Sequence, residues 1–170
     1  SAPEAGLGAH LLASLREGFL EQKALAERAL EQLDDAAFFA LLDPQSNSPA
    51  LIVKHLAGNL RSRWRDFLTS DGEKPDRDRD AEFEPGDETR AELMQLWEAG
   101  WAELFGALAA LGADDLRRRV TIRAAPLSVT QALLRALAHA AQHVGQLVLL
   151  AKHRRGPDWR TLSVPKRGRG

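Results

Sequence analysis

The sequence predicts an all-α protein, folded as an antiparallel four-helix bundle with one long charged loop and a small β-hairpin before the last helix. Four long segments carry apolar side chains at helical spacing, one connection is much longer than the others, and no internal repeat is visible. A chain of 170 residues has the usual size of one domain. We therefore expect the bundle to cover residues 1–156 and a basic tail to cover residues 157–170.

The first helix is predicted over residues 7–33, which are rich in alanine, leucine and glutamate, all of them good helix formers. Its apolar side chains recur every three or four positions, as the buried face of a helix requires. Asp34 or Asp35 can then cap a short helical turn, which Pro44 ends.

The second helix is predicted over residues 49–68. Ser46 or Ser48 can accept a free backbone N–H at its start, and Pro49 suits the first helical position. Its apolar stripe consists of Ile52, Val53, Leu56, Leu60, Trp64 and Phe67.

Residues 69–86 break the helical pattern with two glycines, two prolines and alternating charges, and Phe83 is their only large apolar side chain. We interpret this segment as a long loop with a solvated surface, in preference to a lid over a functional site. The third helix then begins near Asp87 or Thr89 and ends before Gly112.

Residues 119–129 are the one stretch with strand character, because apolar and polar side chains alternate and Pro126 marks a turn. A small hairpin is expected here. Ser128 or Thr130 can cap the last helix, which continues to His153 and ends at the Gly-Pro pair that follows.

The composition excludes several classes of protein. The formal net charge of −1 gives no overall attraction to nucleic acid or to an anionic membrane. The absence of cysteine excludes disulfides, thiolate ligands and a cysteine nucleophile. No apolar run approaches the roughly 20 residues of a membrane span, and no signal peptide is apparent. We therefore expect a cytoplasmic protein that binds neither membrane nor nucleic acid.

The C-terminal tail is the one strongly basic segment. From residue 152 to residue 170 there are seven lysines and arginines and a single acid, Asp158. Such a tail can contact nucleic acid, but short basic tails more often stay mobile or pack on an acidic surface. Residues 71–92, with ten acids and four bases, offer such a surface.

Two histidines in the last predicted helix lie four positions apart, in the segment ALAHAAQHVG. Side chains at this spacing are one turn apart and within about 40° of each other, so His139 and His143 can bind one ion together. His55 lies beside the apolar stripe of the second helix, so three imidazoles can converge from two helices. Three neutral imidazoles suffice to hold zinc or another divalent first-row metal and leave one position open.

A structural role is the alternative for these histidines, because an imidazole near an apolar face often only completes a hydrogen bond in the core. His10 and His153 have no histidine four positions away and lie near helix ends, so neither is predicted to bind metal.

Other catalytic motifs are absent from the sequence. The segment HAAQH lacks the glutamate that serves as general base in the metalloprotease helix motif. There is no glycine-rich phosphate loop, no GxSxG nucleophile turn, no CxxC pair and no repeated Glu-x-x-His of a di-iron bundle.

The segments NSPALIVKHLAGNLRSRW, TSDGEKP and ALAHAAQHVGQLVLLAKH occur in this order. Together they resemble the DinB-like (YfiT-like) superfamily of metal-binding four-helix bundles, and within it an uncharacterised bacterial subgroup. The likeness extends over nearly the whole chain. It implies that a histidine on the second helix and an HxxxH pair on the last long helix bind a divalent metal, which maps onto His55, His139 and His143.

The resemblance also implies an activity, because characterised members include S-transferases and isomerases that use bacillithiol, mycothiol or similar thiols. This chain is then expected to be a divalent-metal-dependent thiol S-transferase in detoxification or stress response, with zinc, nickel or iron as its metal. A metal lowers the pKa of a bound low-molecular-weight thiol. Asn59 could orient a ligand, and Leu149 could contribute to the homodimer that members often form. The alternative is a non-catalytic bundle that binds a metal or a small ligand.

Overall fold

The computed structural model describes residues 6–164 of the chain, and these residues are mostly helical, as the sequence predicts. The long helices are α1 (Leu7–Leu30), α3 (Pro49–Trp64), α4 (Arg90–Ala110) and α5 (Val129–Arg155), and α2 (Asp35–Phe39) is short. The remaining elements are the 3-10 helices η1 (Ala81–Phe83), η2 (Ala113–Arg117) and η3 (Gly156–Asp158) and the strands β1 (Arg119–Ile122) and β2 (Ala125–Ser128).

Short polar side chains start three of the long helices. The side chain of Ser48 accepts the backbone N–H of Leu51 at the start of α3. Thr89 and Ser128 each form a reciprocal capping box at the start of α4 and α5. All three are among the residues that the sequence offers as caps, so these helix starts are confirmed.

Two helices end earlier than predicted. The first ends at Leu30 instead of residue 33, and α3 ends at Trp64 instead of residue 68. At the end of α3 the chain leaves the helical conformation at Arg65, which is extended (ψ 121°), and Asp66 follows with a φ of 50°. The apolar pattern continues past this point because Phe67 still packs into the core from a turn.

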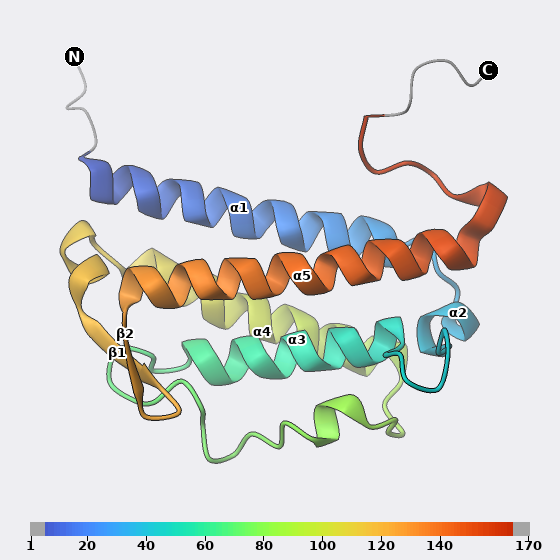
Figure 1. Ribbon diagram of the computed structural model, residues 1–170, viewed down its shortest axis with the longest axis horizontal. Coiled ribbons are helices and arrows are strands. Elements are labelled where there is room, and N and C mark those ends of the chain that lie inside the picture. Colours follow the sequence, from blue (N-terminus) through green and yellow to red (C-terminus); the bar gives the residue numbers. More distant parts are fainter. Residues whose placement is uncertain (1–5, 165–170) are drawn as a thin grey trace.

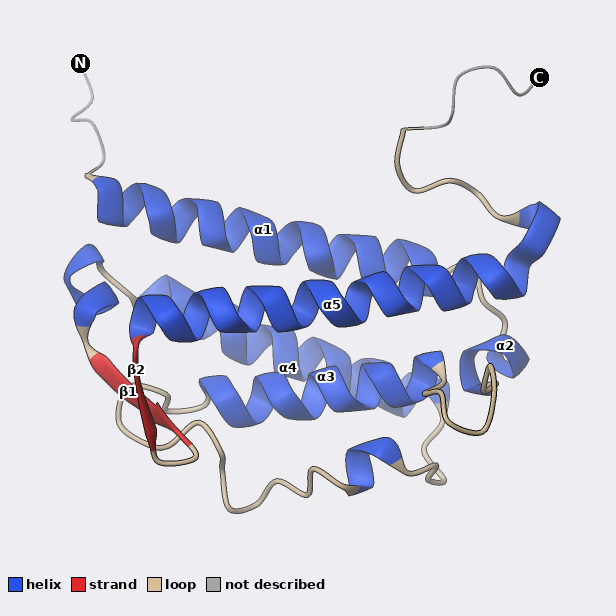
Figure 2. Cartoon of the chain, in the orientation of Figure 1, coloured by secondary structure: helices blue, strands red, loops and turns tan. Residues whose placement is uncertain are grey.

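The long helices lie side by side but do not alternate in direction (Figure 1). The pair α1 and α5 runs one way and the pair α3 and α4 runs the other way. The helices pack mainly within these pairs, with Gly18 against Leu137 and Gly100 against Ala57. The predicted antiparallel arrangement is therefore wrong for both pairs. Parallel neighbours need a long crossover, and residues 65–89 supply it by returning along α3 (Figure 2).

Aromatic side chains fill the centre of the molecule. Trp97, Trp101 and Phe19 have no exposed surface, and the rings of Phe19 and Trp101 meet edge to face at 6.4 Å. The indole Nε1 of Trp97 donates to Glu27 at 3.0 Å. Burial of each such ring contributes about 1.5–3 kcal/mol to folding, so core packing accounts for these tryptophans.

The strands β1 and β2 form an antiparallel hairpin with Arg119 opposite Ser128 and Ile122 opposite Ala125. The predicted hairpin is therefore confirmed. Alternate residues of β1 are buried, which ties the hairpin to the helices.

Where it is described, the C-terminal tail packs against the chain just after the end of α1. Gln32 accepts the backbone N–H of Arg160 at 2.9 Å and donates to the carbonyl of the same residue at 3.0 Å. This part of the tail therefore does not pack on the acidic residues 71–92, contrary to that expectation. Residues 165–170, which carry the rest of its positive charge, lie outside the described residues.

Two expectations concern the outer surface of the helices. Among the described residues, no helix has the length and apolar character needed to cross a membrane. Leu149 on α5 is 66% exposed, and its part in a homodimer stays a prediction.

The closest approach of α3 and α4 gives a test of this packing. A Cβ atom at Gly100 would lie 2.8 Å from the backbone oxygen of Ala57, so Gly100→Ala must push the two helices apart. We expect it to lower the free energy of unfolding by about 1–3 kcal/mol. Gly106, in the same helix, has nothing within 4 Å of a Cβ. Gly106→Ala should therefore raise stability by about 0.5–1 kcal/mol. Urea unfolding measures both, and equal effects would contradict the close packing.

Candidate metal centre

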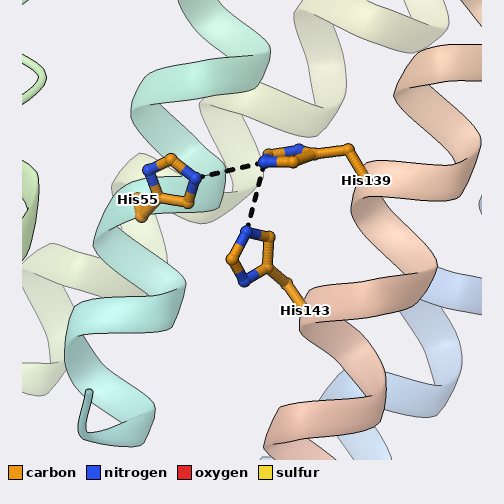
Figure 3. Close-up of side chains that lie close together, drawn as sticks. All are labelled: His55, His139 and His143. Carbon is orange, nitrogen blue, oxygen red and sulfur yellow. Dashed lines mark hydrogen bonds between the residues drawn. The ribbon is translucent and has the colours of Figure 1, made fainter. Parts of the chain in front are cut away.

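Three imidazoles meet between α3 and α5. His55 lies on α3, His139 and His143 lie on α5, and all three point toward one another (Figure 3). The Nε2 atom of His139 is 3.2 Å from Nε2 of His55 and 3.1 Å from Nε2 of His143. One ring nitrogen of each residue lies within 4.8 Å of the other two. The structure thus brings together the three residues selected from the sequence.

The outer partners of two rings determine where their protons lie. His55 Nδ1 is 2.9 Å from a carboxylate oxygen of Glu82, and His143 Nδ1 is 2.8 Å from the amide oxygen of Gln146. Both partners accept hydrogen bonds, so both Nδ1 atoms donate. In a neutral imidazole the second nitrogen then carries only a lone pair. His55 and His143 each present such a lone pair at Nε2.

The Nε2 atom of His139 faces both lone pairs and cannot satisfy them together. A proton on this atom can be donated to one neighbour only, and without the proton three lone pairs meet. A cation accepts all three. Metal–nitrogen bonds of about 2.0–2.1 Å at tetrahedral angles hold the nitrogens roughly 3.3 Å apart. The two observed separations of 3.2 and 3.1 Å are close to this value, so the residues present fit a divalent metal.

Electrostatics favours the neutral imidazoles that a metal requires. Burial is the main cause that lowers the pKa of His139 to about 4, and the neighbouring His143 and His55 lower it further. Burial also lowers the pKa of His143, although the hydrogen bond with Gln146 opposes this change. At pH 7 His139 is therefore uncharged.

Glu82 is the buried partner of His55. It lies in η1, which places it against α3, and it is only 6% exposed. Arg77 donates to both its carboxylate oxygens, at 2.7 and 2.8 Å. Burial opposes the charge of Glu82, but the hydrogen bonds from Arg77 and His55 outweigh burial and lower its pKa. A carboxylate behind a metal-binding histidine orients the ring and raises its basicity.

Sequence reasoning missed Glu82 and Arg77, because it interpreted residues 69–86 as a solvated surface. That interpretation is wrong for the inner part of the loop, where Glu82 and Lys74 are buried. In the sequence, nothing distinguishes the charged residues of this segment that are buried from those that are exposed. One signal was available in Phe83, whose ring lies 4.6 Å from the ring of His55. This single large apolar side chain marks the part of the loop that turns inward.

Gly58 gives Glu82 its place beside α3. It lies one turn after His55, and a Cβ atom at this position would be 2.2 Å from Oε1 of Glu82. Any side chain here would displace the carboxylate. Helix α3 therefore supplies both a histidine and the gap that admits its partner.

A pocket of about 280 Å³ opens beside the three histidines. Asn59 lines it, together with Phe83 and residues 120–123 of the hairpin. The pocket makes Asn59 available to a ligand, and its orienting role stays a prediction.

Asp71 secures the hairpin that forms this wall. Its carboxylate accepts the backbone N–H groups of Arg123 and Ala124, both at 2.8 Å. These two residues take φ values of 53° and 59°, which residues other than glycine rarely adopt. Hydrogen bonds from the backbone N–H groups, first that of Glu73, lower the pKa of Asp71 well below its usual range. The charged loop therefore has two partners. It fixes the hairpin turn through Asp71, and it orients His55 through Glu82.

His10 and His153 lie apart from this cluster. Both are exposed, and neither belongs to the group of potential metal ligands found among the described residues. Their exclusion, made on sequence spacing, stays a prediction.

The fold and the site define a helical protein with a partly buried three-histidine centre. Comparison with known families matches residues 6–168 to the family described as "Protein of unknown function (DUF1572)". Because the match covers nearly the whole chain, the protein belongs to this family. A search of curated proteins found no match. The family description names no activity, so the chemistry has to be inferred from the site.

The role of Glu82 can be tested with an isosteric change. Glu82→Gln removes the negative charge behind His55, so we expect the affinity for zinc to fall about 10–100-fold. Competition with a chelating dye at pH 7 measures this change. Glu84→Gln is the matched control, because Glu84 lies two positions away and is exposed. Equal zinc affinities in the two variants would show that Glu82 does not support the ligand. Circular dichroism checks that both variants are folded.

Proposed function

We propose that this chain is a divalent-metal-binding helical-bundle protein of the DinB-like type, with His55, His139 and His143 as metal ligands. The observation that carries the proposal is the meeting of three Nε2 atoms, of which His139 Nε2 faces the lone pairs of the other two at 3.1 and 3.2 Å. The low pKa of His139, about 4, supports it further. Imidazole ligands suit zinc, nickel and iron.

We further propose that the centre is catalytic and serves a thiol-dependent transferase. Three protein ligands would leave one position of a bound ion open, and the same three histidines line the pocket of about 280 Å³. When bound, the ion would lower the pKa of a thiol and stabilise the thiolate that attacks an electrophile. The chain contains no cysteine, so a low-molecular-weight thiol has to supply the sulfur.

The residues of the chain keep this arrangement in place. Glu82 and Gln146 accept the Nδ1–H groups of His55 and His143, so both rings keep the tautomer that directs Nε2 inward. Phe83 packs on the ring of His55 and shields it from water. Ordered ligands of this kind need little rearrangement on binding.

A structural or regulatory metal in a non-catalytic protein is the alternative. Structural zinc sites use a fourth protein ligand to complete the coordination. Among the described residues the cluster contains three potential ligands. This count supports a catalytic metal site over a structural one.

The metal itself is the first test. Purified protein grown under metal-replete conditions should contain about one divalent ion per chain by elemental analysis. His139→Ala should lose it, because two imidazoles rarely hold such an ion alone. His153→Ala is the control, since His153 is exposed on the same helix, and it should retain the metal. An unmodified protein without metal would overturn the central proposal.

Activity is the second test. Metal-loaded protein is assayed with bacillithiol, mycothiol or glutathione and with simple electrophiles, and the loss of free thiol is followed. We expect turnover with one of these thiols that falls at least about 100-fold in His139→Ala, because loss of the ion removes the Lewis acid. Equal rates in the two proteins, with metal present in the first, would favour the non-catalytic alternative.

A further inference from the structure

The pocket beside the three histidines has a strongly positive lining. Five arginines line it and no aspartate or glutamate does. These are Arg63, Arg77, Arg79, Arg123 and Arg135. The positive charge of this lining therefore favours the binding of an anion.

Two of these arginines are occupied within the protein. Arg77 binds Glu82 through two hydrogen bonds. Arg63 binds Glu73 at 2.9 Å, and its side chain is only 12% exposed. The side chains of both arginines therefore form part of the pocket wall. Arg123 also reaches Glu73, at 3.0 Å, but its side chain is 54% exposed, so solvent weakens this pair.

The other two arginines are available to a ligand. The guanidinium of Arg79 lies 5.0 Å from the centre of the Phe83 ring. Its nearest carboxylate, Asp80, is 3.8 Å away and 97% exposed, so this pair contributes little. Among the described residues, no hydrogen bond or ion pair is found for the side chain of Arg135, although it lines the pocket.

The position of Arg135 relates it directly to the histidines. It precedes His139 by four residues and His143 by eight on α5, so all three share one face of the helix. A small molecule seated against this face can therefore touch the guanidinium at one end and the histidine cluster at the other. Arginine binds carboxylate and phosphate groups through two parallel hydrogen bonds.

We propose that the pocket binds an organic anion, whose carboxylate or phosphate group is held by Arg135 and Arg79. For catalysis this inference rests on the proposed metal function, and it then names the substrate class: a small anionic molecule whose uncharged end lies at the histidines. Anion binding itself needs only the arginines. It can therefore be measured in the protein without metal.

The test is a titration of metal-free protein at constant ionic strength with succinate, with inorganic phosphate and with the neutral succinamide. Trp64 lines the same pocket, so tryptophan fluorescence or calorimetry can follow binding. We expect one or both anions to bind and succinamide to bind at least about tenfold more weakly. Arg135→Gln should weaken anion binding about tenfold or more, as loss of a charge-assisted pair does. Succinate and phosphate compared in the same protein distinguish a carboxylate from a phosphate ligand.

Arg16→Gln is the matched control, because Arg16 is exposed on α1 and does not line the pocket. It should bind the anions as the unmodified protein does, and Arg135→Lys should recover part of the lost affinity. Equal binding of anions and succinamide, or an equal loss in Arg16→Gln and Arg135→Gln, would overturn the proposal. So would the absence of anion binding in the unmodified protein. The metal content of the protein as purified, before the metal is removed, separates the two proposals. If the purified protein contains no metal but still binds the anion, the anion proposal stands and the metal proposal falls.

Discussion

The Nε2 atom of His139 lies close to two other ring nitrogens whose protons are held elsewhere, and this one contact organises the region around it. Glu82 and Gln146 retain the Nδ1 protons of His55 and His143. A proton on His139 Nε2 can be donated to only one of these two nitrogens, whereas a cation between the rings accepts lone pairs from all three. The helices that carry them, α3 and α5, must stay close enough for the rings to meet. The packing of the rest of the molecule provides that constraint.

That packing comes from two parallel helix pairs. The close contact of Gly100 with Ala57 fixes α4 against α3, while α1 and α5 form the second pair. A parallel pair cannot be joined by a short turn, so the chain between α3 and α4 has to travel back along the helix. The crossover of residues 65–89 therefore passes the histidines. In doing so it delivers Glu82 to His55 and Asp71 to the hairpin turn.

The same crossover explains the chemistry of the pocket. Charged loops are usually solvated, but here Glu73 forms an ion pair with Arg63 and Glu82 forms one with Arg77. These ion pairs stiffen the wall of the pocket. The carboxylates lie behind these arginines and do not line the pocket. The surface toward a ligand therefore combines arginines with the three imidazoles. Such a surface combines recognition of an anion with a place for a cation.

Sequence alone determined the local features of this protein. Helix caps such as Ser48 and Thr89 depend on neighbours three residues away, and the pairing of His139 with His143 depends on one helical turn, so both can be read from spacing. Tertiary structure alone decided the direction of the helix pairs, the inward turn of Glu82 and the access of Arg135 to the pocket. Periodicity specifies which face of a helix is buried, but it carries no information on which way a neighbour runs. Alternating charges likewise do not indicate which one will be buried, because that depends on the gap left by Gly58 on a helix distant in sequence.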